Sequence, residues 1–316
     1  MIEIKDKSTI KLRPGFSMRE MGLASYSLQN TLIYGQDNLG FIMDSIVAGL
    51  VNDYYDLISI DSYSEYVTGW SGLSNVDCSI IDKGNDGTPE RIVKTALWIV
   101  NKLNHSNDSY NCRPLSKAHI LLIDSYEDLI DAYGHKAIDK VLDFIMGFGP
   151  SFGIYTIICV TSHSDDNEFL FKNSGLRLFA CYRQGLDTDA LSHILFRNGL
   201  QFLHVHTDEK PNITEKLNMV IPDTYLIRRL VEAHRLIPYD NDELDLFYKN
   251  TPVNEDELIY ELTTIIKTID SARKDDKKKR EESEDSLILE MKIMNGRVTA
   301  RGNAITDAVL RNMWED

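Results

Sequence analysis

Short apolar segments alternate with longer amphipathic ones through the first 240 residues. The apolar segments are NTLIYG (30–35), LISID (57–61), HILLID (119–124), IYTIICVT (154–161) and LRLFACY (176–182). Segments this short, with few polar residues on either face, are typical of strands in a largely parallel sheet that is covered on both sides. We therefore predict five strands in this part of the chain.

The segments between these strands carry apolar residues at helical spacing. An apolar residue recurs every four positions from Ile42 to Tyr54, which predicts one face of an amphipathic helix. Further helices are expected at 90–103 and from about residue 126 to 146. Strands that alternate with helices predict a doubly wound α/β core. Such sheets bind ligands beyond the carboxyl ends of their strands, which is expected to bring together Gly35, Asp61, Asp124 and Thr161.

Changes in composition and in the pattern of apolar residues divide the chain into three regions. Residues 1–29 are mixed and turn-rich and form an N-terminal lead-in, and residues 30–240 carry the α/β core. Residues 241–316 contain a helical pattern and the charge run KDDKKKREESED, which predict a charged linker and a small helical C-terminal appendage.

Composition is that of a globular protein with a packed core. The chain has 316 residues, of which 43% are hydrophobic and 26% are charged. No apolar run approaches the roughly 18 to 20 residues that span a bilayer, and the start lacks the layout of a secretory signal. We expect a cytoplasmic protein that does not contact membranes. The four cysteines lie far apart and are expected to be buried free thiols.

The net charge of the chain limits the classes of macromolecule that it can bind. The chain has 34 Lys and Arg against 49 Asp and Glu, a formal charge of −15. So acidic a chain repels phosphate backbones at long range, which argues against general affinity for nucleic acid. Protein partners are favoured, and DNA contact is expected only through an assembly.

The turn after the first strand has the spacing of a P-loop, in which backbone N–H groups and a lysine hold phosphate. Gly35 and Gly40 stand at the two glycine positions. Phe41 stands where the lysine belongs, and Ile42 stands where a serine or threonine would bind magnesium.

The third strand closes on a carboxylate, Asp124, as a Walker B strand does. The glutamate that orients the attacking water in active motors is here Ser125. Glu127 could substitute for it, but an acid at a helix start also complements the helix dipole, and we favour that structural role.

These segments, in this order, resemble the FtsK/SpoIIIE/HerA DNA translocases from residue 30 to about 237. LISIDSYSEYVTGWSGL is similar to the strand that ends in Asp-Pro-Lys, and ERIVKTALWIVNKLN to the helix that bears Leu-x-Trp. HILLIDSYEDLI resembles the Walker B strand with Asp-Glu-x-x-Asp-Leu, and GIYTIICVTSHSD the strand that ends in Thr-Gln-Arg-Pro. LRLFACYRQGLDTDALSHIL and the segment from 196 to 235 resemble the closing blocks. The resemblance implies a RecA-like P-loop core and assembly into rings around DNA.

The departures from the family pattern fall on catalytic positions. Besides the changes at 41, 42 and 125, Ser162 and His163 replace Gln-Arg, and Asp189 replaces an arginine. The degenerate nucleotide-site positions are Gly35, Gly40, Phe41, Ile42, Asp124, Ser125, Thr161 and Asp189. No catalytic residue, metal or cofactor is expected, although weak ATP and magnesium binding stays open.

Three functions compete on this basis. The first is a catalytically inactive FtsK-like subunit that acts as a scaffold or regulator in a homo- or hetero-oligomeric ring. The second is a translocase subunit that still binds or hydrolyses ATP through Asp124 and Glu127. The third is a substrate-recognition module, because the degenerate last ATPase domain of type VII secretion proteins such as EssC also resembles this pattern.

Other residues favour structural roles. His204 and His206 alternate on one strand face, yet no third metal ligand is evident nearby. Arg228 and Arg229 are expected on a solvated helix face. The three tryptophans, at 70, 98 and 314, are expected in the core or in an interface.

Overall fold

The computed structural model describes eleven segments of the chain and a few single positions. The described segments are 10–17, 19–35, 39–63, 69–79, 88–105, 114–162, 164–182, 200–208, 210–218, 224–234 and 243–251, with residues 264, 265, 267, 271 and 274. Internal contacts divide the chain into two units, Met1–Ile266 and Lys267–Asp316. The described residues of the second unit are helical, and Ser271 Oγ donates to Lys267 O at 2.9 Å. The domain boundaries expected at residues 29 and 240 stay predictions.

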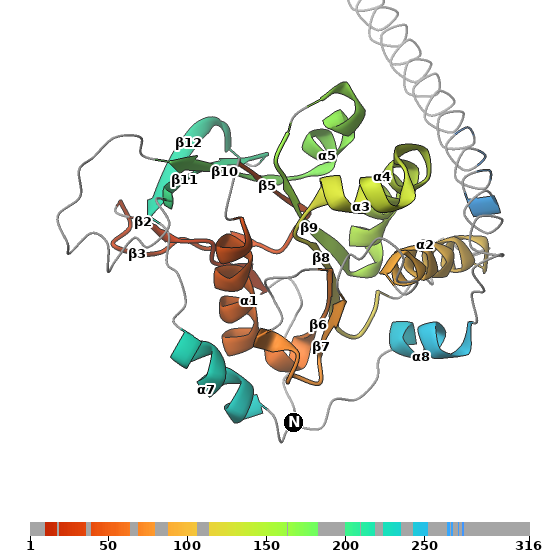
Figure 1. Cartoon of the computed structure of the whole chain (residues 1–316), viewed down its shortest axis with the longest axis horizontal. Helices are drawn as coiled ribbons and strands as arrows, with labels where there is room; N and C mark the ends of the chain where they lie inside the picture. Colours follow the sequence, from red (N-terminus) through yellow and green to blue (C-terminus); the bar gives the residue numbers. More distant parts are fainter. Residues whose placement is uncertain are drawn as a thin grey trace, which may run out of the picture. The chain divides into compact units, whose positions relative to one another are not determined.

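A ten-stranded sheet forms the centre of the first unit, in the order β3-β2-β12-β11-β10-β5-β9-β8-β6-β7 (Figure 1). Six neighbouring strands are parallel. They are β10 (Leu176–Tyr182), β5 (Thr31–Tyr34), β9 (Ile154–Val160), β8 (Ala118–Ile123), β6 (Ile58–Tyr63) and β7 (Val76–Ser79). The five predicted strands are confirmed, and β7 is an addition that the sequence did not reveal because its run VDCS is short and polar.

Antiparallel strands extend one side of this sheet. β11 (Leu200–Thr207) and β12 (Lys210–Asn218) form a hairpin, and β2 (Phe16–Ser17) and β3 (Gly22–Leu23) continue it. A separate pair, β1 (Lys11–Leu12) with β4 (Tyr26–Ser27), completes the N-terminal strands. Part of the lead-in therefore belongs to the sheet, and its two-residue strands are too short for a sequence pattern to predict.

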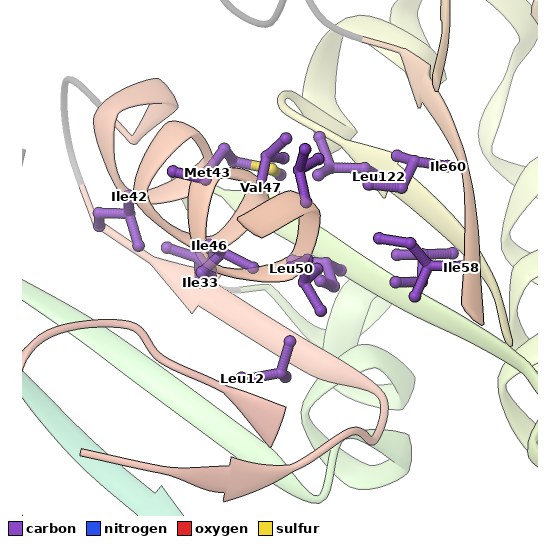
Figure 2. Packing of buried hydrophobic residues seen from close by; sticks show 14 of the residues in the cluster. Leu12, Ile33, Ile42, Met43, Ile46, Val47, Leu50, Ile58, Ile60 and Leu122 are labelled. Carbon is purple, nitrogen blue, oxygen red and sulfur yellow. The ribbon is translucent and has the colours of Figure 1, made fainter. Parts of the chain in front are cut away.

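Helix α1 (Gly40–Tyr54) covers one face of the parallel strands. Its residues Ile42 and Ile46 pack in one cluster with Ile33 of β5 and Ile60 of β6 (Figure 2). The chain continues through the 3-10 turn η2 (Tyr55–Leu57) into β6. Helix α7 (Thr224–His234) lies beside α1, because the His234 ring stacks on Tyr55 with centroids 4.4 Å apart.

The opposite face is covered by α2 (Thr88–His105), α4 (His135–Phe152) and α8 (Glu243–Asn250). Side chains alternate between the two faces of a strand, so Ser59 and Asp61 point to this side while Ile60 points to α1. The smaller elements are α3 (Tyr126–Tyr133), η4 (Asp165–Asn167) and α5 (Glu168–Asn173). The predicted mostly parallel α/β fold with helices on both faces is confirmed.

The prediction of one helix from residue 126 to 146 is wrong. The segment breaks into α3 and α4 at Gly134, whose φ is 86°. An L-residue with a side chain rarely adopts this conformation, whereas glycine does so readily. Gly134 N donates to Ile130 O at 2.7 Å and ends α3. Apolar periodicity continues across the break, which is why the pattern did not reveal it.

The two described tryptophans are buried as predicted, but of the two cysteines whose side chains are described only Cys159 is. Trp70 is 0% exposed and Trp98 is 2% exposed. Cys159 is a buried free thiol, and Cys78 is a half-buried one. Burial raises the pKa of Cys78 to about 11 and that of Cys159 well above its ordinary value. Trp314, Cys112 and the side chain of Cys181 lie outside the described residues. In the described part of the chain, no helix is long and apolar enough to cross a membrane.

Candidate nucleotide site

Three of the four residues expected at the carboxyl ends of the strands do meet at one edge. Gly35 follows β5, and its N–H donates to Val160 O of β9 at 3.2 Å. Asp124 follows β8, and its N–H donates to Tyr63 O of β6 at 3.3 Å. Thr161 follows β9 directly. This edge is where ligands bind in sheets of this kind.

Asp61 is the fourth, and its expected place at this edge is wrong. It lies within β6 and is 3% exposed. Its carboxylate lies 2.9 Å from Nε2 of His119 and 3.1 Å from the Arg91 guanidinium. Burial opposes the ionisation of Asp61, but these two neighbours outweigh it and hold its pKa below the ordinary value. Asp61 therefore belongs to an internal polar cluster rather than to the candidate site.

Gly35 is required by packing. A Cβ on this residue would lie 2.8 Å from Cβ of Ala180 and 2.9 Å from Cδ2 of Leu39. Real Cβ atoms do not approach this closely, so only glycine fits between β10 and the start of α1. The first glycine of the P-loop spacing is thus explained without a bound phosphate. Residues 36–38, the centre of the loop, lie outside the described residues.

The first turn of α1, which begins at Gly40, is anchored in the hydrophobic core. Ile42 is 0% exposed and lies between α1 and the sheet (Figure 2). Leu39 is 5% exposed and belongs to the same cluster. Ile42 N and Met43 N donate to Leu39 O at 3.0 and 3.2 Å. The side chain of Phe41 lies outside the described residues, so its expected place in the nucleotide pocket stays a prediction. Position 42 offers a buried aliphatic group where the family pattern has a hydroxyl.

Ser125 serves as the N-cap of α3. Its Oγ accepts a hydrogen bond from Asp128 N at 3.1 Å. A serine N-cap satisfies one of the free N–H groups of a helix start. The residue at the position of the family's glutamate is therefore engaged in holding α3 in place.

Glu127 joins the start of α3 to the end of β9. Its Oε1 accepts from Thr161 N at 2.8 Å, from Ser162 N at 2.9 Å and from Ser162 Oγ at 3.2 Å. Successive backbone N–H groups that converge on one point form an anion-binding arrangement. Here the bound anion is a carboxylate of the same chain. The sequence indicated an acid at a helix start, but it gave no sign of this contact 34 residues away.

The remaining predicted positions separate into two groups. Asp189 and His163 lie outside the described residues. His204 and His206 lie on β11, and the His206 ring contacts Phe179 with centroids 5.1 Å apart. Over the described ranges, no group of three or more His, Cys, Asp or Glu side chains could hold a metal ion.

A buried polar cluster that the sequence did not reveal fixes α8 to α2. Arg91 of α2 pairs with Asp61 and Asp77, and it lies 3.7 Å from Asp245 of α8. Tyr248 of α8 is hydrogen-bonded to Thr95 at 2.6 Å and lies 3.3 Å from His119 Nε2. A cavity of about 190 Å³ borders the cluster. These partners are far apart in sequence, so no local pattern indicates that they meet.

Solved structures share this fold, whereas no protein-family model and no curated protein sequence matches the chain. The cytoplasmic domain of the type VII secretion ATPase EccC from Thermomonospora curvata has a TM-score of 0.56 at 12% identity, covering 77% of this chain and 32% of that one. ATPases 2 and 3 of EssC from Geobacillus thermodenitrificans have a TM-score of 0.52 at 15% identity, covering 73% and 50%.

A third structure contains ATPases 2 and 3 of Thermomonospora curvata EccC in complex with a signal sequence peptide. It has a TM-score of 0.50 at 11% identity, covering 74% of this chain and 48% of that one. The chain thus spans a third to a half of the length of these proteins. With its parallel strand order and helices on both faces, it is an ATPase-fold module with the RecA-like P-loop NTPase fold.

Proposed function

We propose that this chain is a catalytically inactive ATPase-fold protein of the FtsK/SpoIIIE type. In this proposal it acts as a scaffold or regulatory subunit of an assembly that moves or processes DNA. The observation that carries the proposal is Ile42, a fully buried aliphatic residue at the position where a P-loop holds magnesium.

Phosphoryl transfer depends on charge placement, and this site lacks the groups that supply it. P-loop enzymes hold magnesium with the hydroxyl after the P-loop lysine, and the lysine itself neutralises the phosphates. Ile42 offers no oxygen, and Phe41 offers no charge. The loss of the lysine removes charged hydrogen bonds worth about 1.5 to 3 kcal/mol each. Magnesium nucleotide would therefore bind weakly and in no fixed position.

The contacts of Glu127 argue against a remaining catalytic base. A base must lie within hydrogen-bond reach of the attacking water. Oε1 of Glu127 already accepts from two backbone N–H groups and one hydroxyl. Its Oε2 has no hydrogen-bond partner among the described residues but is buried, so reaching water would need the carboxylate to turn and break all three Oε1 bonds. The structural role predicted for this residue is thus the better supported one.

Charge and structural similarity both favour protein partners. The formal charge of −15 opposes direct DNA binding. The similar structures are secretion ATPases, and one of them carries a bound peptide. We infer that the chain works inside the cytoplasm within a homo- or hetero-oligomeric assembly, and that DNA reaches it only through that assembly.

ATP turnover by the purified full chain tests the proposal. Phosphate release with Mg²⁺ and ATP is measured beside the Asp124→Asn variant, and labelled ATP is titrated with and without Mg²⁺. We expect equal background release from both proteins and no saturable binding up to millimolar ATP. Turnover at motor-like rates that is lost in Asp124→Asn would refute the proposal. Magnesium-dependent binding without turnover would favour a nucleotide-regulated subunit.

A second candidate function is recognition of a secretion substrate. It is favoured by the similarity to EccC ATPases 2 and 3, a structure that contains a signal sequence peptide. A fluorescent helical signal-sequence peptide should then bind with a saturable anisotropy change, and a scrambled peptide of equal charge should not. Equal behaviour of the two peptides removes this candidate.

A further inference from the structure

A polar cavity of about 190 Å³ lies at the amino ends of β5 and β10, away from the candidate nucleotide site. Gln29, two residues before β5, lines it, and so does Thr207, which pairs with Leu176 at the start of β10. Gly35 and Thr161 follow the opposite ends of their strands. The cavity has roughly ten times the volume that one water needs, so a small organic group fits inside it.

The charged groups around this cavity leave an excess of negative charge. Its described lining residues include two carboxylates, Glu20 and Glu215, and one ammonium group, Lys11. Lys11 Nζ donates to Ser27 Oγ at 2.9 Å. Among the described residues, neither carboxylate takes part in an ion pair. The lining therefore favours a ligand with a single positive charge.

Glu215 has a carboxylate oxygen that lacks a donor. The Tyr26 hydroxyl donates to Oε2 at 2.6 Å, but Oε1 is buried and receives no hydrogen bond from the described part of the chain. Burial and the hydrogen bond to Glu215 raise the pKa of Tyr26 well above its ordinary value, so its hydroxyl stays protonated. A buried acceptor without a donor destabilises the protein. A ligand that brings N–H donors to Glu215 therefore gains binding energy from this oxygen.

The cavity reaches from buried residues to solvent. Val205 in its lining is 1% exposed, whereas Glu20 is exposed. Two large apolar side chains lie beside the lining residues in the chain: Met21, next to Glu20, is 74% exposed, and Leu23, next to Ala24, is 50% exposed. Apolar surface next to an acidic cavity favours a cation that is attached to an alkyl chain.

We propose that this cavity binds an alkylguanidinium group, with Glu20 and Glu215 as its acceptors. Hydrogen bonds between a charged N–H donor and a carboxylate are among the strongest in proteins. A guanidinium presents five N–H donors in one plane, so it can bond two carboxylates from different elements at once. The formal charge of −15 also attracts cations to the chain. The group belongs either to a free guanidine compound or to an arginine side chain of a partner protein, which share this chemistry.

Titration of the isotope-labelled full chain with n-butylguanidinium tests the proposal. The amide chemical shifts of Tyr26 and Glu215 report binding, and n-butylurea serves as a neutral ligand of the same shape. At equal ionic strength, we expect saturable shifts with millimolar n-butylguanidinium and none with n-butylurea. Glu215→Gln removes the charge but keeps an acceptor for the Tyr26 hydroxyl, and it is expected to raise the dissociation constant at least about tenfold.

Two further variants separate binding from folding. Lys11→Met removes the ammonium group from the lining and is expected to tighten binding of n-butylguanidinium severalfold, a gain that damage to the fold does not produce. Glu232→Gln is the matched control, because it removes an exposed carboxylate on α7 and should leave the dissociation constant unchanged. Thermal unfolding confirms that each variant is folded.

A second pair of ligands distinguishes the two sources of the cation. Binding of a capped tripeptide with a central arginine, but not of the same peptide with citrulline, assigns the site to a protein side chain. Binding of n-butylguanidinium alone assigns it to a free small molecule. Equal shifts with n-butylurea, an unchanged dissociation constant in Glu215→Gln, or no saturable shift, with water as the only occupant, would each overturn the proposal. ATP takes no part in these titrations, so they leave the test of the proposed function independent.

Discussion

Replacement of Ile42 by serine restores the residue type that a P-loop uses for magnesium, and the buried position of Ile42 sets the cost. The side chain is 0% exposed and packs with Ile33 and Ile46 between α1 and the sheet (Figure 2). Truncation of a buried isoleucine to alanine costs about 2 to 5 kcal/mol in lost apolar burial and cavity formation. The serine hydroxyl can bond to a carbonyl one turn earlier, so it adds at most about 1 kcal/mol. We expect Ile42→Ser to lower the free energy of unfolding by about 3 to 5 kcal/mol.

Urea denaturation measures this loss. Tryptophan fluorescence, to which Trp70 of the same cluster contributes, and far-UV circular dichroism should report one common transition. In a thermal scan, about 2 to 4 °C per kcal/mol gives a Tm lower by roughly 6 to 20 °C. Ile42→Val keeps most of the buried volume and should cost only about 1 kcal/mol. A much larger loss of unfolding free energy in Ile42→Ser than in Ile42→Val would show that the cost follows the buried volume removed, as it does at a core position.

An Ile42→Ser variant within about 0.5 kcal/mol of wild type would refute the reasoning, because changes of that size are typical of surface positions. The position would then face an open site. Recovery of stability by Mg²⁺ and ATP in Ile42→Ser, but not in Ile42→Ala, would likewise show that a hydroxyl here meets a ligand. Either result would remove the observation on which the proposed function depends.

Four further changes test other parts of the structure. Burial raises the pKa of Asp44 from 3.8 to about 6, although the hydrogen bond from Trp70 partly offsets this. The ionised carboxylate therefore opposes folding above pH 6, so Asp44→Asn should gain about 1 to 2 kcal/mol in urea denaturation at pH 8 and almost nothing at pH 4. Tyr248→Phe removes the hydroxyl that bonds Thr95, should cost about 1 to 3 kcal/mol and should speed amide exchange in α8. Glu127→Ala should cost about 1 kcal/mol and speed amide exchange at residues 161 and 162, while Glu127→Gln, which keeps an acceptor, should do so less. Gly134→Ala meets no atom within 4 Å, so its expected cost of about 1 to 3 kcal/mol in thermal unfolding comes from the backbone conformation alone, φ 86° with ψ 140°.

The sequence was sufficient for five of the six parallel strands, because strands buried on both faces consist almost entirely of apolar residues. β8 and β9 are apolar along nearly their whole length, and α1 repeats an apolar residue every four positions. The short strands β2 and β3 could not be predicted, because two residues are too few to show the alternation of apolar and polar positions that is typical of a strand. The break at Gly134 was missed for the opposite reason, since the apolar stripe of α3 continues in phase into α4.

The polar contacts could not be predicted because each depends on residues far apart in the chain. Arg91 of α2 pairs with Asp61 of the buried strand β6, a contact that no local pattern in either segment indicates. Tyr248 lies 153 residues from its partner Thr95. Glu127 was predicted at a helix start, and its contact with the end of β9 exists only because β8 and β9 are neighbours in the sheet.

Three sets of contacts within the chain hold the described parts of this edge of the sheet. Gly35 is confined by Ala180 and Leu39, so packing alone accounts for a glycine at this position. Leu39 and Ile42 turn the start of α1 into part of the core. At the end of β9, the carboxylate of Glu127 supplies the negative charge that the free N–H groups would otherwise take from a ligand. Side chains of the chain itself thus hold the end of β5, the start of α1 and the end of β9, so under the proposed function the fold does not depend on a bound nucleotide.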